Sequence, residues 1–456
     1  MVTLRPPLLL QLMITMTVLV QLSGCQRASE ESVVSTAGDL TDYADLPLVR
    51  KTHHQELRKE VARLISEQAT PALLTRGLDS GGKPLAATDV DPQPNFAAAL
   101  EEVFPVKQRR SLEDRLARIY PLDRFEFSRT KLRGALSLND ELAAQRERYR
   151  GLATNSNDGF RLDHTRGLAI DASFVDAVQL GNRLEALHAA GLLDQGQPQL
   201  ALESLDVLLR MAQLLAREPH LVPRTAAVHL RGEALRVLEA IADHPYSTAE
   251  TQQQLLLRIE QQLADWTQDS DAWLGERAQG LHTYELIRDG YLLSLLDHDE
   301  IQGYRDEYGD DQFGPKVLSN IDADEMFYLT SMRRVIESCE QPYFERQAVF
   351  RRIERQLGAL RETMSYPFVA DQLLLRELEQ GHRWQALDTA RCLAWQLALG
   401  TAIGHEPYEV PVNPITGFRF ILEIRPDKVI VDAIDPQREE RPVVVRRIRA
   451  ARGETE

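Results

Sequence analysis

The sequence predicts a mainly α protein: an irregular antiparallel helical array that carries a small β-hairpin near its C-terminus. Apolar residues recur at spacings of three and four through most of the region from 168 to 406, as they do on one face of a helix. Short connections that contain proline or glycine separate these periodic segments, an arrangement typical of antiparallel neighbours. An alternating pattern, typical of strands, replaces the helical one only after Pro407.

The clearest periodic segment spans Gln199 to Arg217, with Pro198 at its entry and Pro219 just beyond its exit. One apolar stripe runs along this segment, and we expect it to be buried. The stripe consists of Leu202, Leu205, Leu209, Ala212, Leu215 and Ala216. The same pattern predicts three further helices, over Val228 to Ile241, Leu256 to Trp266, and Leu274 towards Leu296.

Weaker helical patterns flank this centre. Upstream they cover Pro47 to Gln68, Leu122 to Arg150 and Asp171 to Ala190, and downstream Glu325 to Glu340, Tyr343 to Thr363, Pro367 to Glu379 and Arg383 to Leu399. Segments 75–94 and 154–167 are rich in Gly, Asp and Asn and are expected to be loops. We therefore divide the body into an N-terminal helical region with loops (41–167) and a helical array (168–406).

Residues 407–435 are predicted to form the β-hairpin. Apolar residues alternate from Phe418 to Ile424, a turn follows at Arg425 to Lys428, and Val429 to Ile434 returns. A hairpin alone is marginally stable, so it must pack on the helices. Residues 436–456 form an arginine-rich tail, which we expect to be solvated, although it could instead contact anionic lipid or another strand.

The first 24 residues resemble a lipoprotein signal peptide. Arg5 precedes an uncharged stretch from Leu8 to Leu22, and small residues Ser23 and Gly24 lead to Cys25. We expect cleavage before Cys25, lipid attachment to its thiol and acylation of its new amino group. Two or more lipid chains anchor a protein stably, whereas a single chain is marginal. An ordinary secretory signal with a chance cysteine is the alternative. Residues 25–40 are poor in large apolar side chains and are expected to form a flexible tether.

These features place the protein in the cell envelope, bound to the membrane through the lipid on Cys25. By resemblance to the sorting rule of enteric bacteria, Gln26 in place of Asp favours the outer membrane, with the body facing the periplasm. The formal net charge of −16 repels phosphate backbones, so nucleic acid is not an expected partner. Other envelope proteins are the expected partners.

Two further cysteines, Cys339 and Cys392, lie 53 residues apart within helical patterns. Two buried free thiols are the favoured interpretation, and a disulfide between them is the alternative in an oxidising compartment. Zinc would need more ligands at close spacing than these two supply. No metal or other cofactor is predicted.

Three stretches resemble an uncharacterised group of exported helical proteins from planctomycete-type bacteria. They are the helix Leu208 to Pro219, the Gly-Glu-Arg step within Leu274 to Ala278, and the turn Asn413 to Gly417, in which Asn413 stands where the group has Asp. The resemblance covers roughly residues 171–434. It implies an exported helical architecture, and no catalytic residue is transferred because the group has no assigned activity.

Several other motifs have simpler explanations. Gly77 to Lys83 has the letters of a phosphate-binding loop, but Pro84 replaces the magnesium-binding Ser or Thr, so a flexible loop is expected. Ten acidic residues between Asp297 and Glu325 do not have the spacing of a calcium-binding loop, and we interpret them as a solvated loop. The pairs His53-His54, His164 with Asp163 and His282 with Glu285 are too common by chance to define a site.

The densest polar constellation follows Trp273. Helical spacing brings together Glu276, Arg277, His282, Tyr284, Glu285 and Arg288. Charged groups near an apolar stripe must be paired or exposed, so inter-helix ion pairs are the favoured interpretation. If the protein has a ligand groove, these six residues line it, with the two arginines binding a carboxylate.

Two functions remain open. The first is a membrane-anchored helical scaffold or protein-interaction module, which needs only surface and stability. The alternative is an envelope hydrolase or ligand-binding protein that uses a groove lined by the Glu276–Tyr291 helix. No recognisable catalytic motif occurs in the sequence, which favours the scaffold and leaves enzyme activity an open question.

Overall fold

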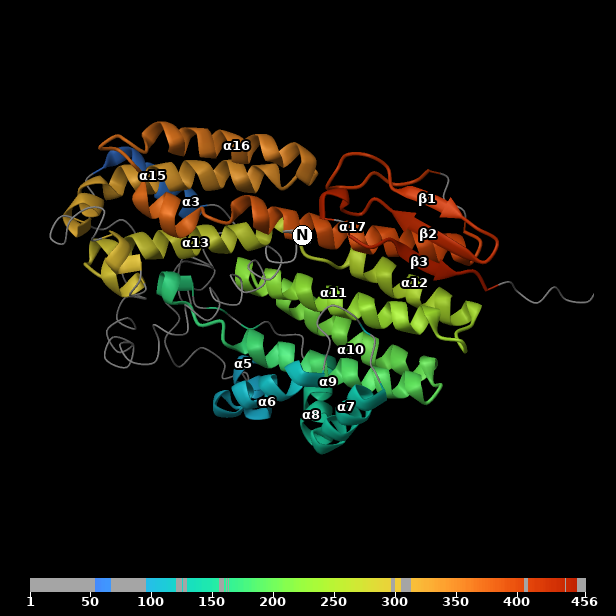
Figure 1. Ribbon diagram of the computed structural model, residues 1–456. Coiled ribbons are helices and arrows are strands. Elements are labelled where there is room, and N and C mark those ends of the chain that lie inside the picture. Colours follow the sequence, from blue (N-terminus) through green and yellow to red (C-terminus); the bar gives the residue numbers. More distant parts are fainter. Residues whose placement is uncertain are drawn as a thin grey trace, which may run out of the picture.

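The computed structural model describes residues 54–66, 96–119, 125, 129–155, 160, 162, 164–296, 300–304, 313–405, 409–438 and 440–448. These residues form a mainly α protein with a small antiparallel sheet near the C-terminus, which confirms the predicted fold class. The helices lie side by side in layers (Figure 1), from α15 and α16 at one side of the molecule to α5–α8 at the other.

The N-terminal helices are α3 (Gln55–Ser66), α5 (Phe96–Val103), α6 (Val106–Ile119), α7 (Arg129–Glu141) and α8 (Ala143–Asn155). The array then runs through η2 (His164–Ala169), α9 (Phe174–Asp194), α10 (Pro198–Ala216), α11 (Leu221–Asp243), α12 (Ala249–Ala264), α13 (Asp269–Arg288) and η3 (Leu292–Leu295). It ends with α15 (Phe313–Ser338), α16 (Tyr343–Leu360), η4 (Ala370–Leu374) and α17 (Leu378–Ala402).

Helix α10 lies between α9 and α11 at the centre of the core (Figure 1). All six residues of its predicted apolar stripe are buried. Pro198 occupies the first turn, where its missing N–H costs nothing. The start of α12 is fixed by a capping box, in which Thr248 and Thr251 bond each other's backbone N–H groups through their hydroxyls.

Several helical boundaries differ from the prediction, and three of the differences change an element. Helix α13 ends at Arg288 rather than continuing towards Leu296, because Gly290 adopts a φ of 97° and a 3₁₀ turn follows. The segment from Leu122 to Arg150 is divided at Leu142 into α7 and α8. The predicted helix Pro367 to Glu379 is instead a short π-helical turn, η4, directly before α17.

The predicted hairpin is part of a three-stranded antiparallel sheet of order β1-β2-β3. Strand β1 (Ile421–Ile424) pairs with β2 (Lys428–Asp432), which pairs with β3 (Val443–Arg446). The expectation that the tail over residues 436–456 is solvated is therefore wrong over β3, where the chain pairs with another strand, as the stated alternative allows. The inner face of the sheet buries Val429, Val431, Val443 and Val445 where β2 and β3 contact α17.

The predicted loop over residues 154–167 is replaced in part by structure, because α8 extends to Asn155 and η2 begins at His164. The predicted signal peptide, Cys25, the tether and the Gly77–Lys83 motif lie outside the described residues. Within the residues that are described, no helix combines the length and apolarity needed to cross a membrane.

Candidate functional site: the polar surroundings of helix α13

Helix α13 carries all six residues of the predicted ligand groove. It packs against α11, α15 and η2. Arg277, His282, Tyr284 and Glu285 are buried, and the side chains of Glu276 and Arg288 are mostly covered. These residues therefore lie inside the protein. Their polar contacts form three layers, the first around Gly275 and Glu276, the second around Arg288, and the third at the N-terminal end of α13.

The first layer joins two of the motifs that the resemblance rests on. The backbone of α13 at Gly275 approaches the loop between α10 and α11 so closely that a Cβ there would overlap the carbonyl of Pro219. Glu276 accepts a 2.9 Å hydrogen bond from the backbone N–H of Leu221. Glycine at 275 is therefore explained by close approach of two backbones, and the Glu-Pro and Gly-Glu-Arg motifs meet in space.

Both ring nitrogens of His220 have partners in this layer, and its Nδ1 also lies 3.3 Å from Oε1 of Glu276. Its Nδ1 accepts from the backbone N–H of Val222, so its Nε2 carries the proton and donates to Oε1 of Gln279 at 3.0 Å. His164 donates from Nε2 to the carbonyl of Pro219 at 3.0 Å, and its ring centroid lies 5.8 Å from that of His220. Burial, and then the neighbouring His220, lower the pKa of His164.

The second layer surrounds Arg288 at the end of α13. Its guanidinium lies 2.5 Å from Glu285 on the same helix, and 2.7 and 2.5 Å from Asp322 and Glu325 on α15. The expected inter-helix ion pairs are thus present for Arg288, whereas Glu285 pairs with Arg288 within α13. Three carboxylates share one guanidinium, so the group carries excess negative charge.

Glu325 is the most deeply buried of these three carboxylates. Its side chain is 0 % exposed, and desolvation raises its pKa to about 8 although Arg288 acts in the opposite direction. At neutral pH one proton is therefore shared within the group. The prediction that the acidic run from Asp297 to Glu325 forms a solvated loop is wrong at this end, where Asp322, Asp324 and Glu325 belong to α15.

Asp324 is the hydrogen-bond acceptor for two neighbouring elements. Its carboxylate accepts a 2.6 Å bond from the hydroxyl of Tyr284 on α13, and 2.8 and 2.9 Å bonds from the backbone N–H groups of Val369 and Ala370. Burial raises the pKa of Asp324 to about 6. Asp324 thus connects α13 to the first turn of η4, which is a structural role for the predicted site residue Tyr284.

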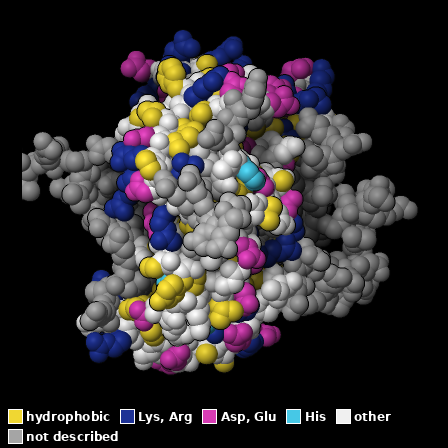
Figure 2. Space-filling model, turned by 90° about the vertical axis from the view of Figure 1, so that its right-hand side faces the viewer, with side chains coloured by type: hydrophobic (Ala, Val, Ile, Leu, Met, Phe, Trp, Pro, Cys, Tyr) yellow, Lys and Arg dark blue, Asp and Glu magenta, His cyan; other side chains and the backbone are white. Residues whose placement is uncertain are grey.

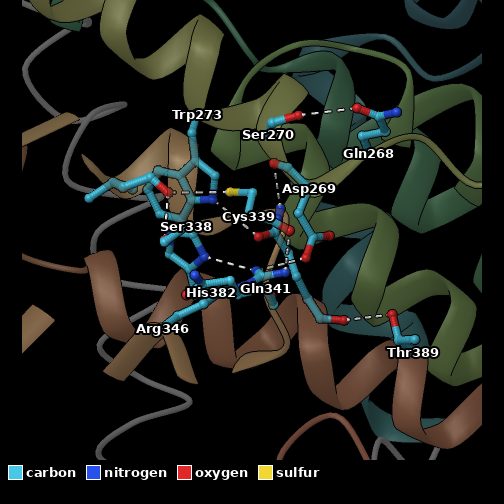
Figure 3. A network of polar contacts seen from close by, with 12 residues as sticks. Gln268, Asp269, Ser270, Trp273, Ser338, Cys339, Gln341, Arg346, His382 and Thr389 are labelled. Carbon is cyan, nitrogen blue, oxygen red and sulfur yellow. Dashed lines mark hydrogen bonds and ion pairs between the residues drawn. The ribbon is translucent and has the colours of Figure 1, made fainter. Parts of the chain in front are cut away.

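The third layer lies at the N-terminal end of α13 and is shown in Figure 3. Arg346 of α16 uses four hydrogen bonds: to the carbonyls of Gln341 (2.6 Å) and Cys339 (2.9 Å), to Oδ2 of Asp269 (2.9 Å), and to Nδ1 of His382 (3.0 Å). One guanidinium therefore joins α13, the end of α15, α16 and α17.

The aromatic rings in this layer are stacked. Trp273 lies parallel to the His382 ring at a centroid distance of 4.3 Å and donates from its indole N–H to Gln385 at 3.2 Å. Gly381 lets the two helices approach, because a Cβ there would lie 2.8 Å from the Trp273 ring. Burial and the adjacent Arg346 hold the pKa of His382 well below its usual range.

Both described cysteines are free thiols, with Cys392 buried and Cys339 partly buried. This agrees with the favoured interpretation. Burial raises the pKa of each thiol to about 12, so neither is a reactive thiolate at neutral pH.

The described part of the chain contains no group of three His, Cys, Asp or Glu side chains arranged to hold a metal ion. Sequence reasoning did not identify Asp269, Arg346, His382, Asp324 or Glu325 as members of a polar network. Their partners lie on other helices, so no spacing within one helix could indicate them. Chemically, the buried carboxyl groups beside α13 can hold protons, and the hydrogen bonds of the three layers fix the neighbouring helices to α13.

Comparison with known proteins gives no match to a family model, to a curated protein or to a solved structure. The resemblance to the planctomycete-type group therefore stays a prediction.

Proposed function

We propose that this chain is a membrane-anchored lipoprotein of the cell envelope, attached through lipid on Cys25 and serving as a helical scaffold that binds other envelope proteins. The anchor is supported by the sequence, in which Leu22-Ser23-Gly24-Cys25 follows an uncharged stretch. The scaffold role is supported by the structure of the described body.

The observation that carries the scaffold role is the exposed apolar edge of the C-terminal sheet. Phe418 and Ile421 are 78 % and 61 % exposed, and Val412 and Ile424 are also exposed. All four lie on or beside β1, an edge strand of the sheet, where Ile421 and Ile424 point to opposite faces. Exposed apolar side chains along an edge strand favour pairing with a strand of another chain.

The backbone of β1 adds to this surface. The N–H of Arg425 bonds the carbonyl of Lys428, so in the antiparallel ladder the N–H and C=O groups of Leu422 and Ile424 point away from β2. An extended segment of a partner can pair with such an edge by adding a strand. Charged side chains of both signs are interspersed over the face of the molecule in Figure 2, which suits selective rather than general adhesion.

Labelling cells that express the protein with palmitate tests the anchor. We expect label on the wild type and none on Cys25→Ala, while Cys339→Ala, which changes a different thiol, keeps it. Unlabelled wild type, or label that survives in Cys25→Ala, would refute the anchor.

Photo-crosslinking in native envelopes tests the scaffold separately. A photoreactive residue at Phe418 or Ile421 should give discrete adducts with envelope proteins. The same residue at Tyr246 or Met364, which are 70 % and 83 % exposed outside the sheet, should give fewer. Equal yields from all four positions would refute the β1 edge as the binding surface.

A further inference from the structure

A pocket of about 290 Å³ lies between α3, α15 and α16, away from the polar layers of α13. This volume lies at the lower limit of small-molecule sites, and the pocket is open to solvent, so only a compact ligand fits. One stripe of α15 forms the wall, and the start of α3 and one residue of α16 complete it. The residues used below are His54, Met326, Phe327, Thr330, Arg334 and Gln356.

The pocket contains a guanidinium, that of Arg334, whose partner among the described residues is neutral. Arg334 donates from Nη1 to the side-chain carbonyl of Gln356 at 3.0 Å, which is a neutral partner. Among the described residues no carboxylate lies within ion-pair distance of Arg334. The preceding residue shows the contrast, because Arg333 pairs with Glu60 of α3. In a chain of net charge −16, Arg334 is thus half-buried with only a neutral partner among the described residues.

The neighbouring polar groups also offer donors. Because the Oε1 of Gln356 accepts from Arg334, the amide NH₂ of Gln356 is the group that can donate to a ligand. His54 also lines the pocket, and its Nδ1 accepts the backbone N–H of Leu57 at 3.1 Å. Donors from α15 and α16 therefore lie beside one small space.

The rest of the wall is apolar. Met326 and Phe327 contribute side chains, and the hydroxyl of Thr330 is turned inward to bond the carbonyl of Met326 at 2.8 Å. A ligand with a negatively charged hydrogen-bond acceptor at one end and an apolar body at the other matches this arrangement. A carboxylate fits a guanidinium better than other anions of its size because two parallel hydrogen bonds form.

We propose that this pocket binds a small organic carboxylic acid with an aromatic or branched apolar body. The carboxylate pairs with Arg334 and accepts from Gln356, and the apolar body packs on Met326 and Phe327. Because His54 directly precedes α3, the bound acid also lies between the start of α3 and the array, beside the buried residues Leu57, Val61 and Leu64. This inference does not depend on the lipid anchor or on the β1 edge.

Calorimetric titration of the purified full-length chain with 3-phenylpropionate tests the proposal, with the neutral alcohol 3-phenylpropanol as the matched probe. We expect saturable binding of the acid at least about tenfold tighter than that of the alcohol. Arg334→Gln should reduce binding of the acid to the level of the alcohol. Arg351→Gln, which removes an exposed arginine of α16, should leave it unchanged.

A second variant guards against a trivial loss of folding. Gln356→Glu places a carboxylate beside Arg334 and should abolish binding while the thermal midpoint is maintained or raised by the new ion pair. Hydrogen exchange of α3 should also slow when the acid is bound. Equal affinity for acid and alcohol, or acid binding that Arg334→Gln leaves intact, would overturn the proposal.

Discussion

Arg346 donates a hydrogen bond from Nη1 to Nδ1 of His382 at 3.0 Å, and this contact determines the protonation state of a buried histidine. A protonated ring would turn an N–H towards the guanidinium, so the two cations would face one another. The other neighbours of His382 are the Trp273 and Phe350 rings, while Asp269 binds Arg346 itself. His382 must therefore stay neutral while the protein is folded.

This contact predicts an acid-sensitive fold. The unfolded imidazole takes up a proton near pH 6.5, whereas the pKa of folded His382 lies well below that value. Below pH 6.5 the unfolded state binds one more proton, so the free energy of unfolding falls as pH decreases, by at most about 1.4 kcal/mol per pH unit. His382→Asn keeps an acceptor for Arg346 and should flatten this dependence in urea unfolding between pH 5 and 6.5. His405→Asn, an exposed control, should not; equal slopes in both variants would contradict the argument.

Glu325 predicts the opposite dependence. Its pKa rises from about 4.5 unfolded to about 8 folded, so between these values the folded state holds one more proton and the free energy of unfolding falls as pH increases. Glu325→Gln removes this titrating carboxyl group. The variant should gain stability relative to wild type by up to about 1.4 kcal/mol per pH unit from pH 5 to 7.5. The exposed Glu337→Gln on the same helix is the control, and a constant difference across this range would show that Glu325 stays ionised.

Gly275 and Gly358 form a matched pair of helical glycines. Gly275→Ala would force the α13 backbone away from Pro219, and overpacking of this kind costs about 1–3 kcal/mol or more. Gly358 on α16 has open space around its Cα, so Gly358→Ala should stabilise by about 0.5–1 kcal/mol through helix propensity. Thermal unfolding of both variants distinguishes close approach from propensity. A neutral effect of Gly275→Ala would contradict the contact with Pro219.

Local signals predicted the parts of the fold that depend on local physics. Pro198 marked a helix start because the effect of its missing N–H is confined to one turn. The apolar stripe of α10 was predictable because burial of one face repeats with the helical period. The end of α13 was missed because Gly290 lies within a periodic apolar pattern that continues through η3.

The polar layers could be predicted only as residue types. The expected pairing of Arg288 is present, but two of its three partners lie on α15, and sequence spacing carries no information about contacts between helices. Asp324 and Glu325 belong to an acidic run that looks solvated because their buried partners lie elsewhere in the chain. Strand β3 was missed because flanking arginines gave Val443 to Val445 the composition of a solvated tail.

Asn413 provides the last prediction, at the turn before β1. Its amide donates to the carbonyls of Ala433 and Ile434 at 2.7 and 2.8 Å, and its Oδ1 accepts from the N–H of Ile415 at 2.8 Å. Asn413→Asp would replace both donors by a buried carboxylate facing two carbonyls, at a cost of about 1–3 kcal/mol or more. Protonation of the new carboxyl restores one donor, so the loss should shrink as pH falls below the pKa of the new acid.

Hydrogen exchange of β1 and β2 measures this effect locally, because Asn413 fixes the turn to the end of β2. Exchange should accelerate there in Asn413→Asp at pH 7 and less so in acid. The exposed Gln197→Glu makes the same amide-to-acid change elsewhere and should leave the sheet unaffected. If Asn413→Asp instead protects the sheet as well as wild type does, the carboxylate must be accommodated by rearrangement of the 433–434 backbone, and the two donated hydrogen bonds are not what holds the turn.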